Sequence, residues 1–565
     1  MAIRRITLVF ALLCAVALSC KKEPSVVPSD NGGGDAPAVV SGNIQGTVIS
    51  SSGDPIAGVV VSDGLHCTKT NAKGEWGLEA DLANTDYVFV STPSEYSAPL
   101  VDGTPTFWKF LKDLTKKDGK YSGVTFKLEK IPNPNRFTVL IYADPQPRSS
   151  GAGYDNMGYH SLELCNDMYK DMKEVVDGIT GRYVYAMGLG DIVHEVLSYH
   201  TKHRSGMAST GARNYNVIGN HDHNTSCTTN DRDAARPFES VLGPANYSFD
   251  LGNLHFLVLD NMIGKLVDGK ISNACDNGLT DEIWQWMQND LSYVPKDKTI
   301  MVCAHSPMFR LLGSKDRSEA KHYGDYKALL HKYKKVYAWA GHTHTSFNYV
   351  NTDDPVIESH TLTRVTGELW TNEYLGSNGT PRGYVVFDYD NGDCRWKFKP
   401  MYYHTAKYDG KGSSGSNSWD YSGPEYKYRD WDYDESGRAK MRSGGKALDD
   451  SYQMQLFGPT LYGDGYIYAN IFLWDELWKN PRFVTDGFAS KMTKVTTNNF
   501  KYAFSMKEIR DYYVKNNPAL AGSSYKFEAN NTESMFCVRP NTEHGSGTVS
   551  VEDRFGNTYS STITW

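Results

Sequence analysis

The sequence predicts an α/β core with a β-rich segment on each side. Between residues 131 and 400, short apolar runs alternate with runs whose apolar residues recur every three or four positions, which is the pattern of strands alternating with helices. Residues 42–130, and the chain after Met454, instead show short alternating runs separated by Gly, Asp and Asn, which is typical of antiparallel sheets. A chain of 565 residues is long enough for about three or four domains.

The first 41 residues predict an export signal and a tether. Two arginines precede a short apolar run, Ile6 to Leu18, which is too short to span a bilayer. The run ends in Ala17-Leu18-Ser19-Cys20, which resembles the bacterial lipobox, with Ala17 where that motif usually has leucine. Residues 1–20 are therefore expected to be a lipoprotein signal with Cys20 lipidated, and residues 21–41 a flexible tether. A plain cleaved secretory signal is the alternative.

Composition limits the partners. A net charge of −7 argues against a nucleic-acid partner held by a basic surface. Because residues 1–20 are expected to be a lipoprotein signal, the protein is expected to be exported and lipid-anchored in the cell envelope, on the periplasmic side or at the cell surface. No other segment is apolar enough to cross a membrane, so the lipid is the expected membrane contact. The sequence leaves the oligomeric state open.

The cysteines do not predict a thiolate metal site. Seven remain after Cys14 and Cys20, and the chain has no Cys-x-x-Cys pair. In an oxidising compartment, Cys227 and Cys275 are a candidate disulfide because both are expected in loops.

Residues 42–130 are expected to form a β-sandwich. Ile44–Ile49 and Gly58–Ser62 are alternating runs bounded by turn residues. The stretch Gly53-Asp54-Pro55-Ile56-Ala57-Gly58-Val59, followed by residues 70–76, resembles the transthyretin-like sandwich attached to many secreted hydrolases. Nothing in it has the character of a catalytic site, so a spacer or substrate-rim role is expected.

Residues 131–400 are expected to alternate strands with helices. Helical periodicity covers 160–176, 280–291 with Thr280 as N-cap, and 326–336. Residues 247–249 and 255–259 predict a hairpin turned by Gly252-Asn253. The five apolar strands that matter most are 137–142, 183–187, 215–218, 300–304 and 336–340.

Each of these five strands is followed by residues of metal-binding types. In chain order they are Asp144-Pro145-Gln146, Gly190-Asp191, Gly219-Asn220-His221-Asp222, His305 and Gly341-His342-Thr343-His344. Singly, such motifs occur by chance, but open α/β sheets place their sites at the carboxyl ends of strands. Two neighbouring cations need a bridging carboxylate and several other ligands. The ordered set therefore predicts a two-metal hydrolase.

This ordered set resembles that of the calcineurin-like metallophosphoesterases, over about residues 136–400. With its flanking β-domains the chain is similar to exported bacterial members. The resemblance implies a four-layer αββα sandwich at 131–400 and a C-terminal β-rich domain at 401–565. It implies a first metal ligated by Asp144, Gln146, Asp191 and His344, and a second ligated by Asp191, Asn220, His305 and His342.

The chemistry implied is hydrolysis of a phosphate ester, phosphomonoester or phosphodiester, by a metal-held hydroxide that attacks phosphorus. The expected cofactors are two divalent metal ions: Mn, Fe or Zn. Gln146 stands where the family usually has histidine, and its harder, weaker amide oxygen shifts the expected preference toward Mn²⁺ or Mg²⁺. His221 is expected to protonate the leaving oxygen, and Asp222 to hold the His221 ring.

Other residues have less specific roles. We expect His194, His223 and His255 to be structural or to support ligands. Arg310, Arg364 and Arg382 are candidates to clamp a phosphate or to form ion pairs.

Residues 401–447 are rich in Tyr and Trp and are expected to be an ordered loop or an aromatic rim for substrate. The alternative from another functional class is a non-catalytic glycan-binding lipoprotein that uses its β-domains. A nuclease is a third reading, disfavoured by the acidic charge.

Overall fold

The computed structural model describes residues 40–565 except 149–160, 314–315, 368–375, 377, 402–430, 434–438, 442–449, 460–462 and 496–531. The expected signal, with Cys20, and nearly all of the expected tether lie outside the described residues. Within the described part of the chain, no helix is both long and apolar enough to cross a membrane.

Two sheets form the centre of the core. The first has the order β14-β13-β12-β23-β24, with bounds Arg213–Val217, Tyr183–Leu189, Arg136–Tyr142, Gly383–Asp390 and Asp393–Pro400. The second has the order β15-β16-β19-β20-β22-β21, with bounds Tyr247–Leu251, Leu254–Leu259, Thr299–Ala304, Lys335–Ala340, Ile357–Thr361 and Phe347–Val350. Within each sheet the strands that precede the metal-type motifs are parallel to one another: β12, β13 and β14 in the first, β19 and β20 in the second.

Side-chain alternation along β12 shows how the layers are built. Phe137, Val139 and Ile141 belong to the core that also contains the second sheet. Leu140 and Tyr142 point to the opposite face and join a core with helical residues such as Met168. Because successive side chains of a strand point to opposite faces, this strand is buried on both sides.

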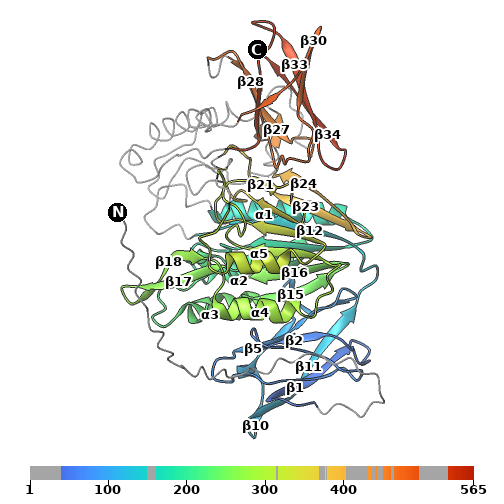
Figure 1. The fold of residues 1–565 in the computed structure, drawn as a ribbon, viewed down its shortest axis with the longest axis vertical. Helices are drawn as coiled ribbons and strands as arrows, with labels where there is room; N and C mark the ends of the chain where they lie inside the picture. Colours follow the sequence, from blue (N-terminus) through green and yellow to red (C-terminus); the bar gives the residue numbers. More distant parts are fainter. Residues whose placement is uncertain are drawn as a thin grey trace, which may run out of the picture. The chain divides into compact units, whose positions relative to one another are not determined.

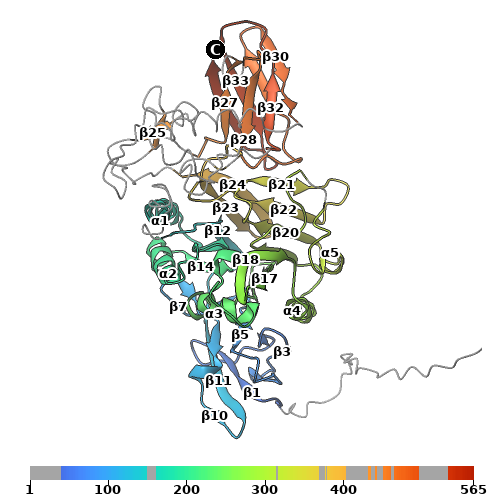
Figure 2. The same cartoon turned by 90° about the vertical axis from the view of Figure 1, so that its left-hand side faces the viewer.

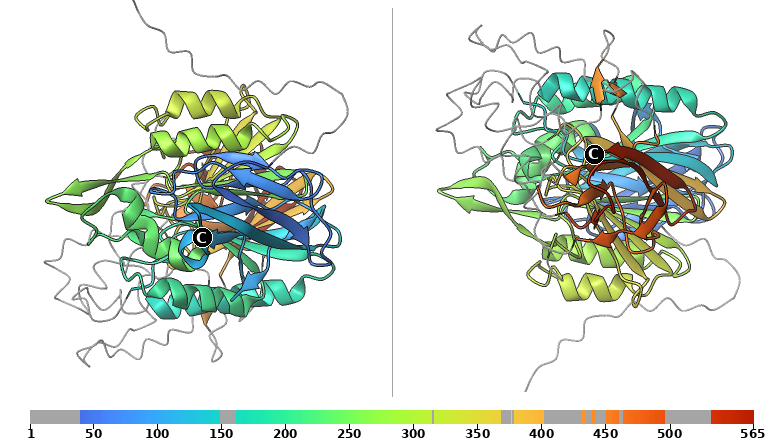
Figure 3. Two further views of the ribbon diagram at one scale, coloured as in Figure 1. Left: turned by 90° about the horizontal axis from the view of Figure 1, so that it is seen from below. Right: turned by 90° about the horizontal axis from the view of Figure 1, so that it is seen from above.

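Helices cover the two outer faces. Helices α1 (Ser161–Gly178) and α2 (Tyr199–Thr210) lie on one side, and α4 (Asp281–Leu291) and α5 (Tyr323–Leu330) on the other (Figure 2). Views from below and above show the same arrangement (Figure 3). Helix α3 (Asp231–Leu242) packs Phe238 and Leu242 against Ile192 and Val193. The predicted four-layer αββα sandwich is confirmed.

Two of the three predicted helices lie where their apolar spacing placed them. Thr280 caps α4, its Oγ1 accepting from Ile283 N at 3.3 Å, as expected. Helix α5 begins and ends earlier than predicted, since Val336 lies in β20. The predicted hairpin around Gly252-Asn253 is present as β15 and β16.

Helices α2 and α3 were not predicted from the sequence. The buried face of α2 includes His200 and His203, which give no apolar period. Helix α3 contains Pro237, although Asn230 caps it, its side chain accepting from Asp233 N.

Two packed sets of strands precede the core (Figure 1). One sheet has the order β10-β11-β1-β4 with β6 on β11, and the other β3-β2-β5-β9. The bounds of the first are Lys116–Lys117, Lys120–Lys130, Ile44–Ser50, Glu75–Leu78 and Tyr96–Ser97. Those of the second are Cys67–Lys69, Val60–Ser62, Tyr87–Ser91 and Trp108–Phe110. A short pair, β7 (Leu100–Val101) and β8 (Thr104–Pro105), and the 3-10 turn Leu111–Asp113 complete this region.

The described C-terminal residues form two further sheets. One has the order β27-β28-β32-β31 and the other β30-β29-β33-β34. The bounds of the first are Met454–Phe457, Ile467–Ile471, Met535–Val538 and Thr493–Lys494. Those of the second are Phe488–Lys491, Arg482–Thr485, Ser546–Glu552 and Thr558–Thr564. Most of the aromatic stretch 401–447 lies outside the described residues, apart from strands β25 (Trp431–Tyr433) and β26 (Ala439–Met441).

One expectation about the cysteines is wrong. Cys275 lies in β18 (Lys270–Asn277), which forms a hairpin with β17 (Met262–Val267), rather than in a loop. Among the cysteines that the structure describes, Cys227 and Cys275 included, none is joined in a disulfide.

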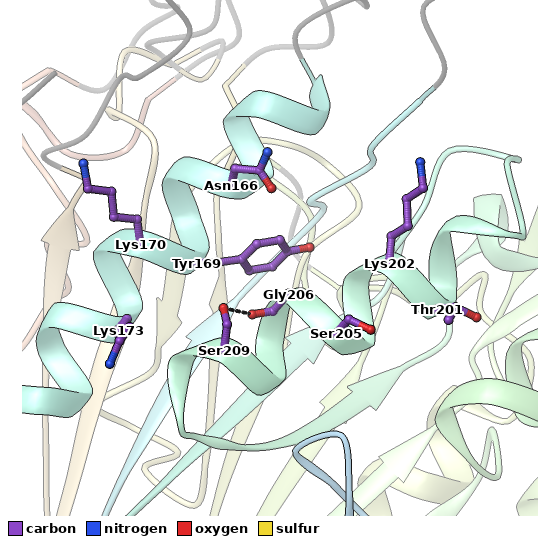
Figure 4. A pocket seen from close by; sticks show the side chains of 9 residues that line it. All are labelled: Asn166, Tyr169, Lys170, Lys173, Thr201, Lys202, Ser205, Gly206 and Ser209. Carbon is purple, nitrogen blue, oxygen red and sulfur yellow. Dashed lines mark hydrogen bonds between the residues drawn. The ribbon is translucent and has the colours of Figure 1, made fainter. Parts of the chain in front are cut away.

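A groove of about 650 Å³ lies between α1 and α2 (Figure 4). Lys170, Lys173 and Lys202 line it together with Tyr169 and small polar residues. The lining includes no imidazole or carboxylate, so this groove does not hold the predicted chemistry.

Glu239 of α3 contacts Tyr87 of β5, in the β-rich segment that precedes the core, and the burial of Glu239 makes stability depend on pH. It is buried, and its Oε1 accepts from Tyr87 Oη at 3.0 Å and from Ala245 N at 3.3 Å. Burial raises the pKa of Glu239 to about 7. The folded protein therefore keeps a proton there that the unfolded chain, with a pKa near 4.5, releases earlier.

We expect this stabilisation to be complete below pH 4.5 and to be lost as pH rises through about 7, up to about 3 kcal/mol in all. Glu239→Gln, which stays neutral, should melt higher relative to wild type at pH 8.5 than at pH 5. The exposed Glu282→Gln is the control. An equal melting difference for Glu239→Gln at both pH values would contradict the account.

Candidate metal centre

The predicted ligands meet because their strands end at one edge of each sheet. Asp144, Asp191, Asn220, His305 and His342 each lie within three residues of the end of β12, β13, β14, β19 or β20. Parallel strands bring such positions together at a common edge. The edges of the two sheets face one another, since His342 N, after β20 of the second sheet, donates to Asp144, after β12 of the first, at 3.0 Å.

Two groups of potential ligands share Asp191. Asp191, His305 and His342 form one group, and Asp144, Asp191 and His344 form the other, with the ligand atoms of each group all within 4.8 Å of one another. Asp191 Oδ1 lies 3.2 Å from His305 Nε2, and Asp144 Oδ1 lies 3.4 Å from His344 Nε2. This is the arrangement that two cations bridged by one carboxylate require.

The two amide residues complete the sets. Gln146 Nε2 donates to Asp191 Oδ2 at 2.6 Å, which leaves its Oε1 for another partner. Gln146 Oε1 and Asn220 Oδ1 are buried, and no described residue hydrogen bonds to either. Because a buried acceptor without a partner costs about 1–3 kcal/mol, these oxygens fit a role as cation ligands. The donor set of carboxylate, imidazole and amide is suited to divalent cations.

Backbone contacts orient the imidazoles. His305 Nδ1 lies 2.8 Å from the carbonyl oxygen of Leu189, so this nitrogen donates and Nε2 faces Asp191. Such a carbonyl contact behind a histidine is what fixes the tautomer of a metal ligand. His342 Nδ1 lies 3.2 Å from His305 Nε2, so one nitrogen of each ring faces the same position beside Asp191.

The electrostatics of the site favour positive charge. Burial acts to raise the pKa of Asp191, but the charges of His305 and then His221 hold that pKa well below its usual range. Burial lowers the pKa of His305, yet Asp191 outweighs it and raises the value to about 9. Burial and then His305 lower the pKa of His342 to about 3. Asp191 is thus ionised and His342 neutral at neutral pH, and a cation that binds there displaces the proton that Asp191 holds on His305.

The loops that carry these residues are strained. Of thirteen described non-glycine residues with positive φ, six lie here: Asp144, Gln146, Asp191, Glu195, His342 and His344. Left-handed backbone costs about 1–3 kcal/mol per residue and gathers at functional sites. Close packing explains two motif glycines: a Cβ at Gly219 would lie 2.2 Å from Asp191 N, and one at Gly341 would lie 2.4 Å from Asp144 Oδ2.

His221 lies at the exposed rim of the site. Its side chain is 20% exposed, whereas those of His305 and Asp144 are fully buried. Its backbone N donates to Asp191 Oδ1 at 2.9 Å. Its ring stacks on His194, with centroids 4.1 Å apart, and its Nδ1 lies 3.4 Å from Glu195 Oε1. The carboxylate that faces this ring is therefore Glu195.

The expected role of Asp222 is wrong. Its carboxylate accepts from the backbone N of Ile192, Val193 and Gly219 at 2.8–3.0 Å, and lies 3.0 Å from His200 Nε2. The 3-10 turn Asn220–Asp222 directs neighbouring side chains apart. Asp222 therefore stabilises the loop. Apart from its position four residues after Asp191, nothing in the sequence pointed to Glu195.

A pair of substitutions separates the two roles. Glu195→Gln should lower kcat about tenfold without changing the melting temperature. Asp222→Asn, which weakens charge-assisted hydrogen bonds in a buried loop, should cost about 3 kcal/mol of unfolding free energy. Thermal melts and steady-state kinetics measure both effects. If Glu195→Gln destabilised the fold as much as Asp222→Asn does, the assignment would be wrong.

The three arginines contact protein groups. Arg364 is buried, its Nε donating to the carbonyl of Asp144 at 3.1 Å and its Nη2 to that of Gln146 at 3.3 Å. Arg310 pairs with Glu533 at 2.8 Å, and Arg382 with buried Asp167 at 3.2 Å. Arg364 thus holds the first motif loop, and the other two form ion pairs. His255 is structural, lying between Asp250 and Asp290 at 2.8 and 2.9 Å.

Two segments of the chain, one on each side of the ligand residues, match family models. Residues 42–131 match a family model described as the N terminal of calcineurin-like phosphoesterase. Residues 360–559 match one described as the C terminal of calcineurin-like phosphoesterase. Together the matches span about half of the chain and flank the segment that carries most of the ligand residues. No curated protein matches the chain.

Several solved structures are similar. A dimetal phosphatase from Danio rerio is 14% identical, with a TM-score of 0.31, and the match covers 46% of this chain and 98% of that one. A purple acid phosphatase from yellow lupin (Lupinus luteus) seeds is 14% identical, with a TM-score of 0.34, covering 50% of this chain and 52% of that one. A calcineurin-like phosphoesterase from Bacillus subtilis is 13% identical, with a TM-score of 0.28, covering 47% and 91%.

Proposed function

Because this chain belongs to the calcineurin-like phosphoesterases, which are phosphoric ester hydrolases, we propose that its two Asp191-linked ligand groups form a dinuclear site that cleaves phosphate esters. The observation that carries the proposal is the sharing itself: one buried carboxylate belongs to both groups of ligand atoms. A non-catalytic glycan-binding protein would have no use for strained loops that aim carboxylates, imidazoles and amide oxygens at one point.

The ligand assignment follows the two groups. Asp144, Gln146, Asp191 and His344 would hold the first cation, and Asp191, Asn220, His305 and His342 the second. When bound, two such cations supply a nucleophile at neutral pH and screen the charge of the phosphate oxygens. The ligand set suits Mn, Fe or Zn, and the amide of Gln146 favours a hard cation such as Mn²⁺ at the first position.

The chain's own residues supply the remaining chemistry. His221 sits at the rim, where a substrate can reach it, and its ring is clamped between His194 and Glu195. When protonated, the His221 imidazole can hand its proton to the leaving oxygen. The Glu195 carboxylate is itself held by Asn273 of β18, whose Nδ2 donates to it at 2.6 Å. The hairpin β17–β18 therefore borders the substrate side of the site.

The exported, lipid-anchored location is also a proposal. It rests on the N-terminal sequence, with Cys20 as the lipidated residue, and intact-mass measurement of membrane-extracted protein tests it. A diacylglycerol-modified N-terminal Cys20 is expected. An unmodified chain that begins elsewhere would overturn it.

An activity panel tests the function. Phosphomonoesters, phosphodiesters, nucleotides and phospholipid head groups would be assayed with metal-stripped protein, with and without added Mn²⁺. We expect at least one ester class to be cleaved, with activity lost on chelation and restored by Mn²⁺. Activity that survives complete metal removal, or no activity on any ester with both cations bound, would contradict the proposal.

A further inference from the structure

A third group of potential ligands lies apart from the two that share Asp191. His223, Asp231 and Asp260 each offer one ligand atom, and these three atoms lie within 4.8 Å of one another. They come from three segments: the residue after the Asn220–Asp222 turn, the first residue of α3, and the loop between β16 and β17. None of them belongs to the catalytic groups.

The spacing is that of ligands around a cation. His223 Nε2 lies 3.4 Å from Asp260 Oδ2 and 3.6 Å from Asp231 Oδ1. Both distances are longer than that of an ordinary N–H···O hydrogen bond, which is about 2.7–3.2 Å. Two ligands at a tetrahedral angle, each about 2.0–2.2 Å from zinc, lie about 3.4 Å apart. The three atoms thus surround a point rather than bond to one another.

His223 Nε2 is a buried atom in need of a partner. The side chain is 1% exposed, and Nε2 hydrogen bonds to no residue that the structure describes. Nδ1 lies 3.0 Å from the carbonyl oxygen of Gly219, so Nδ1 donates and Nε2 faces the carboxylates of Asp231 and Asp260. Two carboxylates around one buried imidazole nitrogen require positive charge at this point, which a proton on Nε2 or a bound cation can supply.

The carboxylates are supported as metal ligands usually are. Asp231 Oδ1 also accepts from Gly264 N at 2.9 Å, and Asp260 Oδ1 accepts from Met262 N at 3.0 Å. With Gly219 behind His223, every ligand is oriented by a backbone group, which is the common pattern around metals.

A route for the ion is present. A cavity of about 530 Å³ is lined by both Asp231 and Asp260. Asp63, Asp81, Glu239 and Glu282 also line it, against Arg232 and His66. Because carboxylates outnumber basic groups in its lining, the cavity concentrates cations, and water can fill the remaining coordination positions.

We propose that His223, Asp231 and Asp260 bind a third divalent cation of the zinc class. The ion ties the start of α3 and the base of the β17–β18 hairpin to the loop that carries Asn220 and His221. Its role is structural, holding that loop in place. The nitrogen-and-oxygen ligand set suits Zn²⁺ or Mn²⁺, and Zn²⁺ is the sharper probe because such sites bind it more tightly.

Metal counting tests the site independently of catalysis. Metal-stripped full-length protein would be loaded with Zn²⁺, gel-filtered and analysed for zinc by mass spectrometry, in wild type and in an Asp191→Ala background. Asp260→Asn, which keeps the oxygen that accepts from Met262, should remove about one zinc per chain in both backgrounds. The control Asp268→Asn, at the exposed hairpin turn, should remove none.

Asp231→Asn serves as a second variant, and circular dichroism of each metal-free protein verifies folding. An unchanged zinc count in folded Asp260→Asn and Asp231→Asn proteins would overturn the third site. A failure of the dinuclear proposal would look different: Asp191→Ala would then leave the zinc count unchanged, while Asp260→Asn would still remove one ion.

Discussion

Asp191→Ala should remove both catalytic cations and lower phosphoesterase activity by about 10³-fold or more. Asp191 belongs to both ligand groups, so its loss breaks the two sites at once. Two-metal charge stabilisation contributes several kcal/mol to such reactions, and each 1.36 kcal/mol is tenfold in rate. Zinc or manganese content and kcat/KM, measured on the same preparation, should fall together.

The matched control is Asp388→Ala. Asp388 lies on β23 beside the opposite, amino-terminal end of β12, where it accepts from Thr138 and pairs with Arg182. This variant should keep its cations and its rate. If Asp191→Ala retained both catalytic cations, the bridging assignment would be wrong.

His221→Ala should leave the cations bound and slow hydrolysis by about 10²–10⁴-fold. The ring does not belong to either Asp191-linked group, and it lies at the exposed rim with Glu195 behind it. The loss should be largest for substrates with poor leaving groups, since these depend most on protonation of the leaving oxygen. An activated aryl phosphate should be affected least.

The comparison across leaving groups separates acid catalysis from other roles. A His221→Ala protein that lost its cations would make His221 a ligand. If His221→Ala slowed the hydrolysis of all substrates equally, His221 would instead be a residue that positions the phosphate. Glu195→Gln should reproduce a weaker version of the same leaving-group trend.

Strand positions and ligand types could be predicted because both are local properties of the chain. Apolar runs identified β12, β13, β14, β19 and β20, and the residues that follow them are of types that bind metals. The parallel arrangement then brings strand ends together. What the sequence could not supply is side-chain direction within a loop, which is why Asp222 was paired with His221.

Helix α2 and the role of Arg364 could not be predicted, for physical reasons that differ. Helix α2 buries His200 and His203, which serve Asp222 and Tyr142 through contacts of 3.0 and 2.8 Å. Polar residues buried for such contacts remove the apolar period by which helices are recognised. Arg364 supports the first motif loop from 218 residues or more away in the sequence, and no local pattern reveals such a contact.

Anomalous diffraction from crystals grown with Mn²⁺ tests the central claim most directly. Two manganese peaks should flank the Asp191 carboxylate, about 3.5–4 Å apart, one beside Asp144 and His344 and the other beside His305 and His342. A single peak, or two peaks that do not share Asp191, would contradict the dinuclear site.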